Sequence, residues 1–310
     1  MGNMAPGLSM LADDLTGACD AGVQFALRGF STVVRISPQA GEDADLVVLP
    51  THSRNDPPEE ACRKVRQACQ TLREEGRELI FKKIDSTLYG NIGVEIEAAM
   101  EACRFREAFV APAFPAQGRR VIDGWLNVEG SDRRLYLPAL LGNRPGIRWF
   151  DAATQEDLKR AAQLAFDAEA LPVGSAGLAA EVAALLPVGQ AVPPVCHPFQ
   201  GNVLFVIGST NPVTLAQVAY LKAHHPEAEV ITVAELLKRP APRALVLSGG
   251  DTALEVCRAL GVRGIRLARE ILPGIPLGTL IGGRCDGLTV VTKAGGFGAV
   301  DALAAVADSL

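Results

Sequence analysis

The sequence lacks the long apolar run that a membrane-spanning helix requires. No uninterrupted apolar stretch approaches the roughly 18–20 residues needed to cross a bilayer, so no membrane association is expected. The first residues, MGNMAPG, carry no basic segment, and Pro6 stands where a myristoylation signal has Ser or Thr. We therefore expect a cytoplasmic protein.

Cysteine and histidine lack the spacing of a metal site or a disulfide framework. The seven cysteines include no C-x-x-C pair, and their odd number argues against complete disulfide pairing. The four histidines show no ligand spacing either. We expect the cysteines to be small buried hydrophobic residues, and no metal ligands can be assigned.

Several nucleotide fingerprints are also missing. There is no G-x-x-x-x-G-K-[ST], which excludes a P-loop NTPase, and no G-x-G-x-x-G after a strand, which weakens a dinucleotide-dependent dehydrogenase. The motif set of protein kinases is absent. A net charge of −5 argues against a broad nucleic-acid surface. Any anion site must be local, made by a few Lys, Arg or backbone N–H groups.

What the chain does contain is a repeated alternation of short apolar runs with amphipathic stretches. The apolar runs predict strands at 8–12, 32–36, 45–50, 78–83 and 107–113, and the amphipathic stretches predict helices at 20–30, 58–75 and 91–104. Strands that are apolar on both faces are typical of a parallel sheet covered on both sides.

A stretch at 185–202 interrupts this alternation. It carries four prolines and two glycines and lacks periodicity, after which the strand–helix pattern starts again. We therefore predict an α/β protein of two domains, 1–190 and 200–310. Each would be a mostly parallel sheet flanked by helices, with a ligand cleft between them.

Three glycine-containing turns follow predicted strands of the second domain, each before a predicted helix. Ligands of open α/β sheets bind at the carboxyl ends of strands, where helix N-termini offer free N–H groups. The candidates for nucleotide binding are Ser209, Ser248, Gly249, Gly250, Asp251, Thr252, Lys293, Gly295 and Gly296. The alternatives are that the glycines serve chain reversal alone, that Lys293 is solvated, and that Asp251 caps a helix instead of reaching Mg²⁺ through water.

The strand ends of the first domain carry polar residues of mixed charge. The catalytic candidates are Asp13, Asp14 and Asp85, and the candidates for substrate binding are Arg54, Lys82, Lys83, Ser86, Asn91, Gln117 and Arg119. Cations suit a carboxylate, and carboxylates and amides suit hydroxyls, so a small sugar acid fits this set. One of the first two aspartates is expected to cap a helix, and one of the two adjacent lysines to face away from the site. The alternatives are that Asp85 forms an Asx-type cap and that Arg119 or Arg120 is exposed to solvent.

These residues resemble a known family. LADDLTGACDAG, THSR, KKIDSTLYGNIGVEI, APAFPAQGR, VGSAGLA, VLSGGDTA and TKAGGFG resemble, in order, the motifs of the four-carbon acid sugar kinases. That family was earlier described as a domain of unknown function and as Hrp-dependent type III effectors. The resemblance runs from residue 9 to 298.

The resemblance implies an N-terminal sugar-acid domain and a C-terminal ATP-binding domain. It implies ATP-dependent phosphorylation of the terminal hydroxyl of threonate, erythronate or a 3-oxo-tetronate, with KKIDSTL more similar to the threonate and erythronate branch. Family members are usually about a hundred residues longer, and Tyr89 replaces the basic residue usual in their DSTLRGN motif.

The predicted mechanism is phosphoryl transfer from ATP with Mg²⁺ bridging phosphates. Arg54, Arg119 or a lysine of the 82–83 pair would hold the acid's carboxylate. Asp14, favoured over Asp85, would orient or deprotonate the attacking hydroxyl. The alternatives are a non-catalytic sugar-acid sensor, a Rossmann-type dehydrogenase and a secreted effector. A homo-oligomer is left open.

Overall fold

The computed structural model describes residues 7–37, 43–187 and 201–310. We call residues 7–187 the first half of the chain and residues 201–310 the second half. The predicted linker, and with it the predicted domain boundary, lies mostly outside the described residues. No helix in the described part of the chain is long and apolar enough to cross a membrane.

The elements of the first half alternate much as expected. Its strands are β1 (Gly7–Ala12), β2 (Thr32–Arg35), β3 (Leu46–Pro50), β4 (Arg77–Lys83), β5 (Ala108–Ala111), β6 (Arg119–Ile122), β7 (Trp125–Val128), β8 (Arg134–Tyr136), β9 (Ile147–Trp149) and β10 (Leu171–Gly174). Its helices are α1 (Leu15–Ala26), α2 (Pro58–Glu74), α3 (Ile92–Cys103), α4 (Leu137–Leu141), α5 (Gln155–Asp167) and α6 (Ala176–Leu185), with a 3₁₀ turn, η1 (Pro115–Gln117).

The second half repeats the strand–helix alternation and adds a hairpin. Its strands are β11 (Val203–Ile207), β12 (Glu229–Ile231), β13 (Ala244–Ser248), β14 (Gly264–Leu272), β15 (Ile275–Ile281) and β16 (Thr289–Lys293). Its helices are α7 (Pro212–His224), α8 (Val233–Leu236), α9 (Gly250–Ala259) and α10 (Ala302–Ser309), with a 3₁₀ turn, η2 (Gly283–Cys285).

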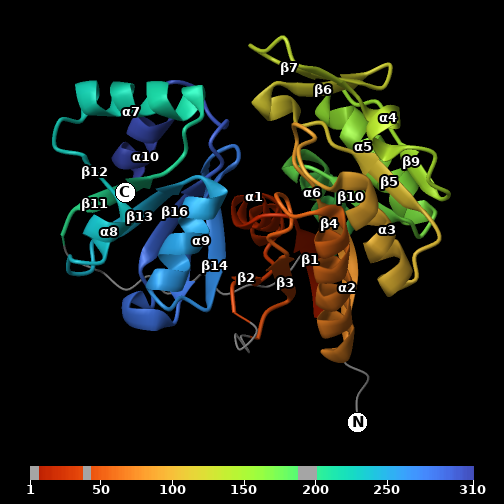
Figure 1. Cartoon of the computed structure of the whole chain (residues 1–310), viewed down its shortest axis with the longest axis horizontal. Helices are drawn as coiled ribbons and strands as arrows, with labels where there is room; N and C mark the ends of the chain where they lie inside the picture. Colours follow the sequence, from red (N-terminus) through yellow and green to blue (C-terminus); the bar gives the residue numbers. More distant parts are fainter. Residues whose placement is uncertain (1–6, 38–42, 188–200) are drawn as a thin grey trace.

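Thirteen of the strands in the described residues form one sheet that runs through both halves, in the order β12-β11-β13-β16-β15-β14-β2-β3-β1-β4-β10-β5-β9. The strands on either side of the β14–β15 hairpin are parallel to their neighbours, whereas the hairpin pairs antiparallel with β2 and β16. This reversal makes the parallel strands of the two halves run in opposite directions. Together with the sheet's twist, it turns both sets of carboxyl ends toward a common space between the halves (Figure 1).

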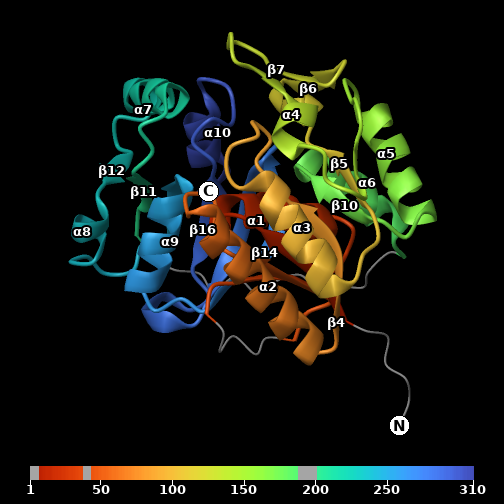
Figure 2. The same ribbon diagram turned by 45° about the vertical axis from the view of Figure 1, so that its right-hand side comes forward.

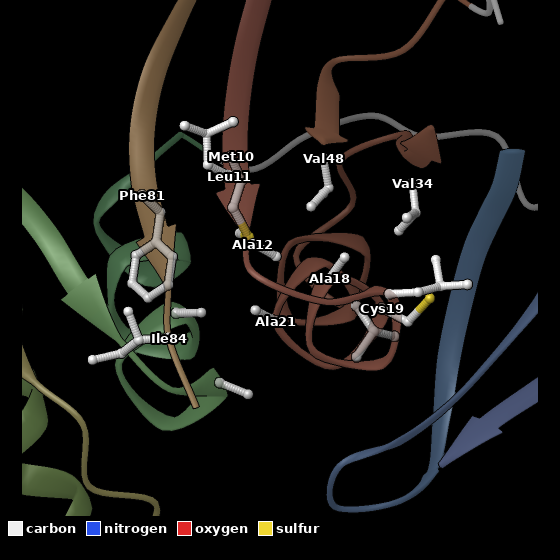
Figure 3. Close-up of a cluster of buried hydrophobic side chains, with 14 of the residues drawn as sticks. Met10, Leu11, Ala12, Ala18, Cys19, Ala21, Val34, Val48, Phe81 and Ile84 are labelled. Atoms are coloured by element: carbon white, nitrogen blue, oxygen red, sulfur yellow. The ribbon is translucent and has the colours of Figure 1, made fainter. Parts of the chain in front are cut away.

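Helix α1 lies at the centre of the molecule, between the two halves (Figure 1). It begins earlier than expected, because Asp14 caps it by accepting a hydrogen bond from Gly17 N. Its small residues allow close packing: Ala18, Cys19 and Ala21 are fully buried and face the apolar side chains of the neighbouring strands (Figure 3). Helices α2 and α3 pack on the other face of the first-half strands (Figure 2).

Within the first half, β6, β7 and β8 form a separate three-stranded antiparallel sheet. Val121 and Leu126 are its buried apolar members, and a bridge between Val121 and Ala152 ties it to the chain before α5. In both views it lies at the top of the molecule, on the side of the space between the halves (Figures 1 and 2).

Candidate active site

A cleft of about 650 Å³ lies between the two halves, where the carboxyl ends of their strands meet. From the first half it is lined by Arg54, Asp85, Thr87, Tyr89, Arg119 and Arg133, and from the second half by three turns, 208–211, 249–252 and 294–297. The structure therefore brings the predicted nucleotide turns together with several of the predicted acceptor residues.

The three turns follow β11, β13 and β16 and pack against one another through their glycines. A Cβ atom at Gly208 would lie 1.9 Å from Thr252 Oγ1, and one at Gly295 would lie 2.4 Å from Ser209 Oγ. Gly249 adopts a φ of 105°, which side chains other than glycine disfavour. Glycine is thus required for the turns to converge, and their convergence presents the N-terminus of α9 to the cleft.

Two of the predicted nucleotide residues lie beneath these turns and not in the cleft. The buried ammonium of Lys293 donates to the carbonyl oxygens of Ala294 (2.9 Å), Gly295 (3.1 Å) and Phe297 (3.1 Å). Burial lowers its pKa to about 8. The ammonium N–H groups of Lys293, which were expected to donate to phosphate, donate to these carbonyl oxygens instead. Lys293 therefore supports the third turn from below. Ser248 is likewise fully buried at the end of β13.

Asp251 lines the cleft at the second position of α9. The alternative that it caps this helix is wrong, because Gly249 is the N-cap residue and no side chain makes a capping hydrogen bond. Among the described residues no group of three or more His, Cys, Asp or Glu side chains is arranged to hold a metal ion. A divalent cation at this site would therefore depend on one or two carboxylates together with a ligand's oxygens and water.

Arg54 is occupied by the two aspartates that follow β1. Its Nε and Nη2 donate to the two carboxylate oxygens of Asp13 at 2.7 and 2.9 Å, and its Nη1 and Nη2 donate to those of Asp14 at 3.0 and 2.8 Å. Burial alone would raise the pKa of Asp13, but the Arg54 guanidinium outweighs it and lowers that pKa to about 2. The expected role of Arg54 in holding a ligand's carboxylate is therefore disfavoured, since four of its five N–H groups are used within the protein.

Asp14 lies directly beside the second glycine turn. A Cβ atom at Gly250 would come within 2.7 Å of Asp14 Oδ2, so the turn after β1 contacts the start of α9. Asp13 and Asp14 line a neighbouring pocket of about 440 Å³ that shares Arg54, Gly250 and Asp251 with the cleft.

The two adjacent lysines at the end of β4 point to opposite faces of the sheet, as their spacing predicted. Lys82 is fully buried and donates to Glu95 Oε2 of α3 at 2.7 Å, so it lies outside the cleft. Lys83 points toward α1, donates to Ile84 O at 3.0 Å and lies 4.0 Å from Asp20 Oδ2. Neither lysine lines the cleft, because each ammonium is buried against a partner of its own.

Two further residues that were predicted to bind substrate do not line the cleft. Asn91 donates from Nδ2 to the carbonyl oxygens of Ser53 (3.0 Å) and Asp56 (2.8 Å) and so braces the loop that carries Arg54. The Ser86 side chain is buried, and its Oγ has no hydrogen-bond partner in the described part of the chain. Both lie behind the cleft wall.

The loop after β4 presents Asp85 to the cleft. Oδ2 of Asp85 accepts hydrogen bonds from Thr87 N (3.1 Å), Thr87 Oγ1 and Tyr89 N (3.2 Å), which fixes the turn. The Asx-type arrangement is therefore present. It uses one carboxylate oxygen, while Oδ1 lies 4.0 Å from Arg54 Nη1 and accepts no hydrogen bond from the described residues.

Gln117 and Arg119 connect the two halves across the end of the cleft. Gln117 donates from Nε2 to Pro273 O at 2.5 Å and accepts from Gly298 N at 3.2 Å. Arg119 donates from Nη2 to Gly296 O at 2.8 Å, and its guanidinium carbon lies 5.0 Å from the centre of the Phe297 ring. Arg119 is 6% exposed, whereas Arg120 is exposed, so the arginine of this pair that faces solvent is Arg120.

Arg133, Phe297 and Gly208 line the cleft although they were not among the predicted site residues. Gly208 belongs to a motif that supplied neighbouring candidates, and its position after a strand could have added it. Arg133 lies in the turn before β8, a segment without periodicity, and no sequence signal distinguishes it from Arg134.

Two family models match the chain: a sugar-binding N-terminal domain at residues 8–142 and a nucleotide-binding C-terminal domain at residues 227–303. A D-threonate kinase of Bordetella bronchiseptica is 32% identical over 98% of this chain and 98% of its own length. The chain belongs to the four-carbon acid sugar kinase family. The resemblance read from the motifs is thereby confirmed.

Other members of the four-carbon acid sugar kinase family match over similar lengths. A D-threonate kinase of Salmonella typhimurium is 30% identical over 93% of this chain and 95% of its own, and a 3-oxo-tetronate kinase of Pseudomonas fluorescens is 28% identical over 96% of each. The Bordetella alignment spans 405 positions against the 310 residues of this chain, so that kinase carries residues that this chain lacks.

Solved structures share the fold. One from Salmonella typhimurium matches with a TM-score of 0.78 at 20% identity, over 98% of this chain and 99% of the other. One from Bordetella bronchiseptica, a domain-swapped dimer with bound citrate, matches with a TM-score of 0.53 at 30% identity, over 99% and 98% of the two chains. The predicted α/β class, with mostly parallel strands flanked by helices, is confirmed. The strands that were expected to form a separate sheet in each domain instead form one continuous sheet.

Proposed function

We propose that this chain is an ATP-dependent kinase that phosphorylates the terminal hydroxyl of a four-carbon sugar acid, with D-threonate as the first substrate to test. The observation that carries the proposal is the cleft. Converging glycine turns and the N-terminus of α9 on one side face a carboxylate and arginines on the other. The names of the relatives, D-threonate kinase and 3-oxo-tetronate kinase, support the same chemistry.

ATP would bind with its phosphates at the three turns of the second half. Backbone N–H groups at glycine turns and at a helix N-terminus suit phosphate oxygens. The proposed nucleotide residues are therefore those of the turns 208–211, 249–252 and 294–297, with Lys293 as a positioning residue beneath the third.

Mg²⁺ fits this cleft as a companion of the nucleotide. Mg²⁺ commonly binds through one or two carboxylates, several waters and substrate phosphates, and Asp251 offers such a carboxylate in the lining. When bound, the ion would neutralise phosphate charge during transfer.

The acceptor would lie against the loop after β4, opposite the glycine turns. Thr87 and the carboxylate of Asp85 line that wall and suit hydroxyl groups. We propose that Asp85 orients the attacking hydroxyl and accepts its proton, because it lines the cleft and its Oδ1 accepts no hydrogen bond from the described residues, while Oδ2 is held by the loop. Asp14, expected from the sequence to do this, is assigned to hold Arg54 and α1.

A domain-swapped relative bears on the partners of the chain. The Bordetella structure contains citrate, a hydroxy acid, and two exchanged chains. We propose by analogy that this chain binds hydroxy acids. Its oligomeric state should be measured together with its activity.

The proposal is tested by an ADP-release assay with ATP and Mg²⁺ across D- and L-threonate, D- and L-erythronate and their 3-oxo forms. We expect turnover with at least one of these acids and none with the matching four-carbon polyols, which lack the carboxylate. Silence with every acid would contradict the proposal. Tight binding of an acid without turnover would instead indicate a sugar-acid sensor.

A further inference from the structure

We propose that Arg133 contacts the phosphate groups of the nucleotide, as the cation that the first half supplies to the site of phosphoryl transfer. This inference rests on the kinase function proposed above and adds a residue to it. Arg133 lines the cleft together with the turns 208–211 and 249–252.

Transfer of a phosphoryl group requires positive charge near the phosphate oxygens, because catalysis consists mainly of positioning and charge neutralisation. The other cations around the cleft are already engaged. Arg54 donates four hydrogen bonds to Asp13 and Asp14. Lys293 is buried beneath the third turn. Arg119 is directed to main-chain oxygens, among them Gly296 O.

Arg133 differs from these cations in having its guanidinium available. Its side chain is exposed, and among the described residues it makes no ion pair and no side-chain hydrogen bond. Its backbone N donates to Ser131 Oγ at 3.1 Å, which shapes the turn before β8. An exposed arginine that lines the same cleft as these turns and the N-terminus of α9 suits phosphate, which binds arginine through paired hydrogen bonds.

The small sheet holds this arginine in place. The turn that carries Arg133 joins β7 to β8, and the sheet is anchored through the buried side chains of Val121 and Leu126. Both views place the β6–β7 part of this sheet at the top of the molecule, beside the space between the halves (Figures 1 and 2).

The neighbouring residue provides a matched control. The guanidinium of Arg134 lies 5.3 Å from the centre of the Trp125 ring, and Arg134 does not line the cleft. Arg133 and Arg134 thus have the same charge and adjacent positions but different surroundings, so a general loss of charge in the loop affects both variants alike.

The test compares Arg133→Ala, Arg133→Lys and Arg134→Ala with the wild type. In the wild type and each variant, kcat and KM are measured for ATP and for the acid, and ATP affinity is measured by calorimetry. We expect R133A to lower kcat/KM for ATP by about 100-fold, the size of effect found for a lost transition-state donor. We expect R133K to recover part of that loss and R134A to stay within about twofold of the wild type.

Two results would overturn the inference: equal ATP binding and kcat/KM for ATP in R133A and R134A, or an effect of R133A on the KM of the acid alone. If neither the wild type nor the variants turn over substrate, calorimetry of ATP binding still tests the inference. Weaker ATP binding in R133A than in R134A would support the contact while the kinase proposal failed. A wild type that binds no ATP would overturn both. Unchanged thermal unfolding of R133A separates the effect from misfolding.

Discussion

Asp14 and Asp85 differ in how many of their carboxylate lone pairs the protein itself uses. Asp14 accepts from Thr16 Oγ1 and Gly17 N, both at 2.8 Å, and from two nitrogens of Arg54, so both its oxygens are occupied. Asp85 lines the cleft and accepts hydrogen bonds through Oδ2, whereas its Oδ1 accepts none from the described residues and lies 4.0 Å from Arg54 Nη1. A general base needs an oxygen free to take a proton, so the two residues have separable roles.

Replacing Asp85 by Asn should therefore reduce kcat by at least about 100-fold, the usual contribution of a general base. It should leave the affinity for ATP nearly unchanged. Replacing Asp14 by Asn retains a helix-capping side chain but removes the charge that binds Arg54, so unfolding free energy should fall by about 1–3 kcal/mol. Steady-state kinetics and urea unfolding of both variants check the assignment. A larger loss of kcat in D14N than in D85N would reverse it.

Asp20 is a buried carboxylate in α1 whose two oxygens have no hydrogen-bond partner among the described residues. Burial is the main cause that raises its pKa to about 7, Lys83 at 4.0 Å opposes the shift, and Glu270 and Asp14 add to it. Between pH 4 and 7 the folded chain therefore keeps a proton on Asp20 that the unfolded chain has lost. Its contribution to stability is present at low pH and is lost as the pH rises through about 7.

Replacing Asp20 by Asn should remove this pH dependence. Below pH 4 the side chain at this position is mostly neutral in both the folded and the unfolded state of the two proteins, so their unfolding free energies should be similar there. At pH 8 the variant should be more stable by a few kcal/mol, on the order of the shift in pKa. The difference between the two proteins is the quantity to measure by urea unfolding, because His52, whose pKa burial lowers to about 4, changes stability in the opposite direction. A constant difference from pH 5 to 8 would contradict the argument.

At the scale of elements, the sequence was sufficient where a segment carries its own pattern. The strands β1, β3 and β4 and the helices α2 and α3 appear within two residues of their predicted bounds, since apolar runs and 3–4 spacing are local signals. The hairpin β14–β15 was not predicted, because its role depends on pairing with β2, more than two hundred residues away in the sequence. Strands β6–β8 were not predicted either, although they pair with their neighbours in the sequence.

In the candidate site, too, features set by local sequence could be predicted and those set by distant partners could not. Glycine turns after strands could be predicted, because backbone conformation follows from residue type, and three of them line the cleft. The destination of a long charged side chain could not. Lys82 and Lys293 occupy expected positions at strand ends, yet Glu95 and the carbonyls of the third turn bind their ammonium groups. Only the folded arrangement supplies these partners.

At the scale of the whole molecule, the two halves are joined by more than a linker. Strand β2 pairs with β14, and one hydrophobic core cluster contains Met10 and Leu46 of the first half together with Leu245 and Leu280 of the second. Mutual burial of this kind couples the stability of the parts that share it. The halves should therefore unfold together even though the family models divide the chain.

Gly22 of α1 offers a way to test this coupling. A Cβ atom there would lie 2.9 Å from Leu267 Cδ1 of β14 and 3.1 Å from Val48 Cγ2 of β3, so the glycine lies where the halves meet. Calorimetry of the wild type should show one transition. Replacing Gly22 by Val should overpack the junction, at a cost of about 1–3 kcal/mol, and lower the single midpoint by about 2–5 °C. Replacing the exposed Leu164 of α5 by Ala is the control and should leave the midpoint nearly unchanged.

Two separate transitions in the wild type would show that β2–β14 pairing and the shared core do not couple the halves. A midpoint in G22V equal to that of the control would show that the junction tolerates the added volume.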